Sequence, residues 1–120
     1  MIKSFRDLEI YQESYKLMIV VHEIVNKFPL YEKSDLSSQI RRASKSIPSN
    51  IAEGWAKRSH EKEFKHYLEV ALGSANEMEV HLETAKGLRY LSVIKSDELL
   101  KRYLQLGGKI ASLKRNWKSF

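Results

Sequence analysis

The chain has 120 residues, of which 42% are hydrophobic, and it carries a net charge of +6 at neutral pH. This length supports one domain with its own apolar core, so we expect residues 1–120 to form a single domain. The sequence has no cysteine, which excludes disulfide bonds, zinc–thiolate sites and thiol nucleophiles.

The sequence also contains no recognisable membrane or export segment. Its first residues lack the apolar stretch of a signal peptide, and no later run approaches the roughly 20 apolar residues that span a bilayer. We therefore expect a cytoplasmic protein without membrane partners. Only two prolines occur, and apolar residues recur at intervals of three and four, which predicts an all-α protein.

The first predicted helix, about residues 5–28, carries two apolar stripes. One contains Leu8, Tyr11, Tyr15, Met18 and Val25, and the other contains Ile10, Leu17, Val21, Ile24 and Phe28. Every helix of a four-helix monomer is peripheral, so one interior does not cover both stripes. We expect the second surface to mediate oligomerisation; a single wide buried stripe is the alternative.

The second predicted helix follows a Ser34 cap and has a proline inside its pattern. Its core-facing positions are Leu36, Ile40, Ala43, Ile47 and Ile51. Pro48 either kinks this helix or breaks it into two. The apolar phase continues from Ile47 to Ile51, which favours the kink.

One flank of the second helix carries a polar ladder with spacings of 3, 4, 4 and 3. A ladder at the edge of a core is usually structural, because buried polar groups are expected to be paired. We therefore predict hydrogen bonds to a neighbouring helix or subunit. The ladder consists of Gln39, Arg42, Ser46, Asn50 and Glu53.

The third and fourth predicted helices show the clearest bundle seams. The third has Phe64, Leu68, Ala71, Ala75, Met78, Leu82 and Ala85, and the fourth, after a Ser96 cap, has Leu99, Tyr103, Leu106, Ile110, Leu113 and Trp117. This alternation of four and three is typical of left-handed helix packing. Short connections make successive helices antiparallel, so we expect an up-down-up-down four-helix bundle.

Several stretches together resemble the 23S ribosomal RNA intervening-sequence proteins, also called four-helix bundle proteins. The most specific is SIPSNIAEG at 46–54; the others are FRDLEIYQ at 5–12, FP at 28–29 with Glu32, QIRRA at 39–43, and Phe64, Leu68, Ala71, Gly73, Ser74 and Glu77. The resemblance implies a bundle that assembles into a homopentameric ring. Some members of the family are encoded within insertions in ribosomal RNA genes, and a related group associates with a reverse transcriptase and nucleic acid in diversity-generating retroelements. The resemblance therefore implies RNA or DNA as a partner, and a reverse transcriptase as a further one.

No catalytic, metal or cofactor site is expected. Glu63 and His66 form one Glu-x-x-His pair, but di-iron bundles need two such pairs facing inward, and neither residue lies on the seam. The serines show no nucleophile–base arrangement. We therefore expect a protein that is not an enzyme.

Basic residues are the remaining functional candidates. Binding a phosphate requires only suitably placed cations. The usual explanation for basic residues on a helix is nonetheless a solvated basic face. The predicted nucleic-acid-binding residues are Arg41, Lys45, Lys57, Arg58, Lys101, Lys109, Lys114, Arg115 and Lys118. Replacing Arg41 and Lys45 by glutamate is expected to abolish binding and leave the oligomer intact. A protein-interaction scaffold that docks a reverse transcriptase or a ribosome-associated factor is the alternative function.

Overall fold

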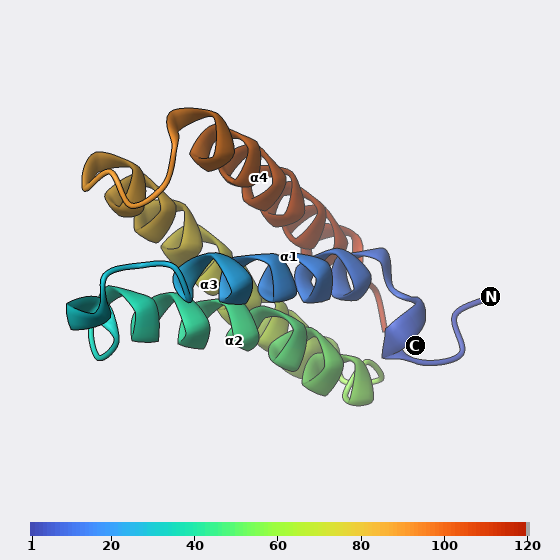
Figure 1. Ribbon diagram of the computed structural model, residues 1–120. Coiled ribbons are helices and arrows are strands. Elements are labelled where there is room, and N and C mark those ends of the chain that lie inside the picture. The colour runs from blue at the N-terminus through green and yellow to red at the C-terminus, as the bar shows by residue number, and fades with distance from the viewer. Residues whose placement is uncertain (120) are drawn as a thin grey trace.

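The protein is a bundle of four α-helices, seen here in a computed structural model that describes residues 1–119 (Figure 1). The helices are α1 (Glu9–Val25), α2 (Leu36–Ala56), α3 (Glu61–Gly87) and α4 (Val93–Asn116). Two short 3-10 turns, η1 (Phe5–Asp7) and η2 (Leu30–Glu32), precede α1 and α2. The described residues contain no strand, so the predicted all-α class is confirmed.

Successive helices run in opposite directions and pack side by side, as predicted. The molecule is elongated, 49 × 24 × 22 Å, and both chain ends lie at the same end of the bundle (Figure 1). Contact is extensive between α1 and α2, α2 and α3, and α3 and α4, but it is sparse between α1 and α4. The bundle is therefore least closed along the α1–α4 seam.

The predicted seams of α2, α3 and α4 form the core, except that Leu113 and Trp117, the last two predicted positions of the fourth seam, are half-buried at its edge. Every seam residue of α3 from Phe64 to Ala85 is at most 1% exposed, and Leu99, Tyr103, Leu106 and Ile110 of α4 are equally buried. The Tyr103 hydroxyl has no hydrogen-bond partner within residues 1–119, and burial raises the pKa of this phenol. The periodicity thus predicted which residues are buried, but it did not reveal this unpaired hydroxyl.

Both predicted serine caps are wrong. Leu36 begins α2 after Asp35, and the Leu36 N–H donates to Oε1 of the buried Glu32 at 3.3 Å, so the preceding turn supplies the cap. Helix α4 begins one turn earlier than predicted, at Val93, where Ser92 Oγ accepts from the Lys95 N–H at 3.1 Å. The exposed side chains of Val93 and Ile94 broke the apolar pattern, which concealed this first turn.

Helix α2 continues through Pro48 without interruption. The alternative of two shorter helices is therefore wrong, while the predicted kink stays a prediction. After Pro48, helix α2 packs closely against α3. A Cβ atom added at Gly54 would lie 2.8 Å from Cβ of Tyr67 on α3. Glycine at this position is what lets α2 approach α3.

Helix α1 buries one of its two stripes and only part of the other. Ile10, Leu17 and Val21 are at most 5% exposed, whereas Tyr15 is 46% and the neighbouring Ile19 43% exposed. The helix itself is shorter than predicted, because residues 5–7 form η1 and the chain leaves the helix after Val25. An apolar surface therefore remains outside the bundle on α1.

No helix formed by residues 1–119 combines the length and apolarity that crossing a membrane requires.

Candidate nucleic-acid interface

Basic side chains gather at the end of the bundle that carries both chain ends. There the end of α2, the start of α3 and the end of α4 meet, and the tail after α4 runs along this end (Figure 1). We call this surface the basic end and define it by its seven cations: Lys57, Arg58, Lys62, Lys65, Lys114, Arg115 and Lys118.

The tail after α4 contacts the connection between α2 and α3 and so holds the helix ends of the basic end together. Trp117 Nε1 donates to the backbone oxygen of Arg58 at 3.1 Å, and the Ser119 hydroxyl donates to the same oxygen at 2.7 Å. The Trp117 ring packs edge-on against Phe64 and Trp55, with centroids 4.8 and 5.7 Å apart. These contacts bring the cations of α4 next to the connection between α2 and α3.

Arg58 is held in place by its own neighbours. Its guanidinium lies 4.7 Å from the centre of the Trp55 ring, and its Nη1 donates to the Trp55 carbonyl at 3.0 Å. A guanidinium has five N–H donors, so most of them are not used by this bond. An arginine ordered in this way loses little further freedom when it binds a phosphate.

Lys65, Lys114 and Arg115 line one groove between α3 and α4, with a volume of about 340 Å³. The Glu61 carboxylate pairs with Lys65 at 3.3 Å and accepts from the Ser119 N–H at 3.2 Å. These contacts, the backbone N–H first, lower the pKa of Glu61. The groove is open, basic and partly apolar.

Four of the predicted binding residues lie outside the basic end. Arg41 is on the first half of α2, where its Nη2 lies 3.5 Å from Asn26 Oδ1, and Lys45 is one turn further along. At 1.5 Å per residue, Lys45 lies roughly 18 Å along the helix from Lys57. Lys101 is exposed on α4, about two turns before Lys109.

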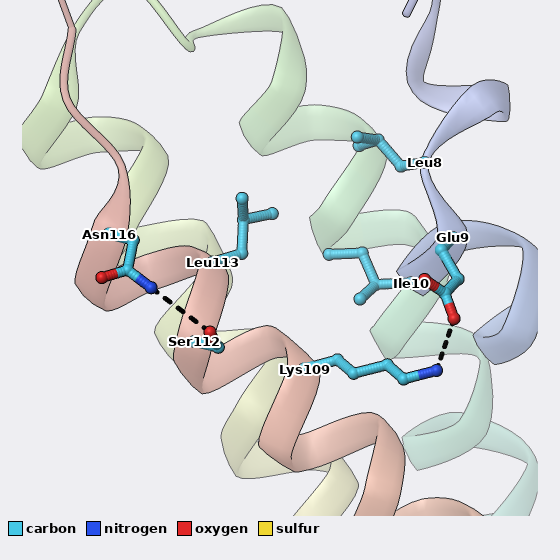
Figure 2. A pocket seen from close by; sticks show the side chains of 7 residues that line it. All are labelled: Leu8, Glu9, Ile10, Lys109, Ser112, Leu113 and Asn116. Carbon is cyan, nitrogen blue, oxygen red and sulfur yellow. Dashed lines mark hydrogen bonds and ion pairs between the residues drawn. The ribbon is translucent and has the colours of Figure 1, made fainter.

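Lys109 is occupied by an ion pair with Glu9, and this contact raises the lysine's pKa (Figure 2). The pair crosses a groove of about 410 Å³ between the start of α1 and the end of α4. The groove wall includes Leu8, Ile10 and Leu113, and Asn116 donates to Ser112 at its far side (Figure 2). We therefore expect Lys109, which is already paired and lies beside an apolar wall, to bind a phosphate more weakly than the clustered cations of the basic end do.

The polar ladder of α2 contains residues with hydrogen-bond partners as well as exposed residues. Ser46 Oγ accepts from Ser74 Oγ of α3 at 2.9 Å and from Asn50 Nδ2 at 3.0 Å, so these residues link two helices. Gln39 donates to Asp35 at 2.9 Å, within its own segment. Arg42 and Glu53 are exposed. Gln39, Arg42 and Ser46 also line a polar groove of about 260 Å³ with Ser74 and Glu77.

Lys62 and Lys65 of the basic end were not among the predicted binding residues. Both lie in a segment whose net charge is negative, so charge counting hid them. Their spacing from Phe64 was the available signal: a helix that buries Phe64 at its start turns nearby lysines outward. Nothing in the sequence placed them beside α4.

Three further findings concern metal binding and family membership. Within residues 1–119, no three His, Cys, Asp or Glu side chains lie close enough to hold a metal ion. No curated protein matches the chain significantly. The family model described as 23S rRNA-intervening sequence protein, in contrast, matches residues 6–112, which is most of the bundle. The chain therefore belongs to the 23S rRNA-intervening sequence protein family.

Proposed function

We propose that this protein is a non-enzymatic, homo-oligomeric nucleic-acid-binding protein, with RNA as its preferred ligand. The observation that carries the proposal is the convergence of two basic segments, distant in sequence, at one end of the bundle through Trp117 and Arg58. Phosphates are bound by such cations without sequence readout. We therefore expect binding that depends strongly on salt and weakly on sequence.

Oligomerisation strengthens this binding. Tyr11 stacks on Tyr15 at a centroid distance of 6.1 Å on the outer side of α1, and Tyr15 and Ile19 are each more than 40% exposed. This surface suits a contact with a second copy. In the proposed pentamer, five copies of +6 give a net charge of about +30, and one strand can engage several subunits at once.

The first test is the solution mass by light scattering, with and without a short single-stranded RNA, at low and at high salt. A pentamer that takes up RNA at low salt and releases it at high salt supports the proposal, with a slope of log affinity against log salt near −0.7 per neutralised phosphate. A pentamer indifferent to RNA at both salts contradicts it.

Charge reversal then locates the binding surface. Lys114→Glu with Arg115→Glu tests the basic end, and Arg41→Glu with Lys45→Glu tests the separate surface on α2. We expect the first pair to abolish binding. In contrast to the expectation from the sequence, the second pair should weaken binding without removing it, because Arg41 and Lys45 lie far from the basic end. Lys27→Glu with Lys33→Glu is the matched control, because both cations are exposed between α1 and α2, at the opposite end of the bundle, and neither is a predicted binding residue.

A protein-interaction scaffold is the second candidate function, and the end opposite the basic end favours it. Leu30, Val93 and Ile94 are 83, 59 and 82% exposed there. The hydroxyls of Tyr31 and Tyr90, 3.1 Å apart, bring the two connections of that end together. A reverse transcriptase or a ribosome-associated factor could dock on this surface. Docking of this kind is expected to respond less to salt than nucleic-acid binding does.

A further inference from the structure

A small pocket at the edge of the basic end combines cations with an aromatic ring. It lies at the joint between α2 and α3, has a volume of about 260 Å³ and is lined by Lys57, Lys62, Glu63, His66 and Tyr67. Lys57 is the C-terminal cap residue of α2, and the other four lie in the first two turns of α3. The pocket is distinct from the groove that Lys65 and Arg115 line.

The Tyr67 ring is the wall of this pocket, and its position follows from the packing of the helices. Because Gly54 has no side chain, α2 lies directly against Cβ of Tyr67, which fixes where the side chain leaves α3. The ring stays partly exposed. His66 lies edge-on to it at 5.6 Å, and Lys57 Nζ lies 6.0 Å from its centre.

We propose that this pocket receives one unpaired base of a single strand. The base stacks on Tyr67, and the phosphates on either side of it bind Lys57 and Lys62. This inference rests on the proposed nucleic-acid-binding function and adds a preference for single strands to it. Stacking on an aromatic ring tolerates any base, since each has a π-face, whereas the bases of a duplex are already stacked and do not reach the ring.

The remaining polar groups suit such a ligand. At the edge of a base, the Glu63 carboxylate can accept hydrogen bonds, and the His66 ring nitrogens can accept or donate them. A duplex, by contrast, presents only its phosphates to a pocket of this size, and those phosphates are bound equally well by the rest of the basic end. The pocket therefore distinguishes single from double strands through Tyr67 rather than through charge.

The test compares two labelled probes by fluorescence anisotropy at low salt: a 12-nucleotide oligouridine and an RNA duplex of the same length. Tyr67→Leu keeps an apolar side chain at the α2–α3 contact and removes the ring. We expect it to weaken oligouridine binding by at least about fivefold, which is the lower limit for one stacked base, and to leave duplex binding within about twofold.

Three further variants separate stacking from charge and from folding. Tyr67→Phe keeps the ring and should retain oligouridine binding. Lys62→Gln should reduce the salt dependence of binding to both probes. Tyr31→Leu, which removes a 74% exposed tyrosine at the opposite end, should change neither affinity.

The outcomes of this test are distinct from those of the proposed function. If Tyr67→Leu lowers the affinities for both probes equally, or lowers neither, the stacking pocket is overturned while nucleic-acid binding stands. If the unmodified protein binds neither probe at low salt, the proposed function itself fails. Circular dichroism of each variant shows whether the bundle is intact.

Discussion

Two glycines on facing helices show how differently one residue type can act in this bundle. A Cβ atom at Gly54 would lie 2.8 Å from Cβ of Tyr67 and 3.2 Å from the Phe64 ring, whereas one at Gly73 would meet nothing within 4 Å. Both glycines lie inside helices, where glycine is intrinsically less favourable than alanine by about 1 kcal/mol. Only Gly54 has a packing reason to be there.

Gly54→Ala and Gly73→Ala are therefore expected to have opposite effects. The first should lower the free energy of unfolding by about 1–2 kcal/mol, because overpacking against Tyr67 exceeds the gain in helix propensity. The second should raise it by about 0.5–1 kcal/mol. Urea denaturation measures both, and equal effects of the two substitutions would show that the α2–α3 contact is not tight.

The residues that cap the N-termini of α2 and α4 could not be predicted from residue type alone. Serines at 34, 92 and 96 are all plausible caps by residue type, yet only Ser92 receives a hydrogen bond from the first turn of a helix, and Ser96 is buried. Glu32 serves α2 because η2 folds it back onto the Leu36 N–H. That choice depends on three-dimensional placement, which residue preferences alone do not contain.

The four helices themselves were predictable, because a periodic seam over four or more turns leaves little choice of element. Their buried faces followed from the same pattern. For the candidate site, the presence of basic residues was predictable, but their arrangement in space was not. Arg58 and Trp117 are 59 residues apart, and the bond between Trp117 Nε1 and the Arg58 oxygen joins them across the folded bundle.

The C-terminal turn of α4 and its tail should accordingly be important for stability. Trp117→Ala removes two aromatic contacts and the bond to Arg58, and we expect a loss of about 2–3 kcal/mol in the free energy of unfolding. Leu104→Ala, at a 63% exposed position of the same helix, should stay within about 0.5 kcal/mol of the unmodified protein.

Denaturation followed by circular dichroism is the measurement for both variants. If Trp117→Ala proves as stable as Leu104→Ala, the tail does not fasten the basic end. In that case the cations of α4 would not be held beside Arg58, and the structural basis of the proposed interface would be lost.

At the scale of the whole molecule, the outer face of α1 decides whether the protein works alone or as a ring. Tyr15 and Ile19 lie one turn apart there, and both are exposed. Tyr15→Glu with Ile19→Glu should reduce the solution mass to that of a 14.0 kDa monomer, because charged side chains oppose burial in an interface.

Light scattering gives the mass of this double variant, and Leu104→Glu is its control, since it places the same charge at an exposed apolar position of α4. A monomeric control, or an oligomer that survives the double change, would move the proposed interface away from α1. The monomer should still bind RNA, but more weakly, because it has lost the avidity of several linked basic ends.

The open seam between α1 and α4 sets the order in which the bundle loosens. Glu13 bridges it by accepting from Arg102 at 2.9 Å, and Glu9 bridges it through Lys109. Partly exposed ion pairs are weak and are screened by salt, whereas the α2–α3–α4 interfaces depend on buried apolar contact. Amide hydrogens of α1 should therefore exchange with deuterium sooner than those of α3, and added salt should widen the difference. We therefore expect α1 to be the first helix to separate from the bundle and the last to pack onto it.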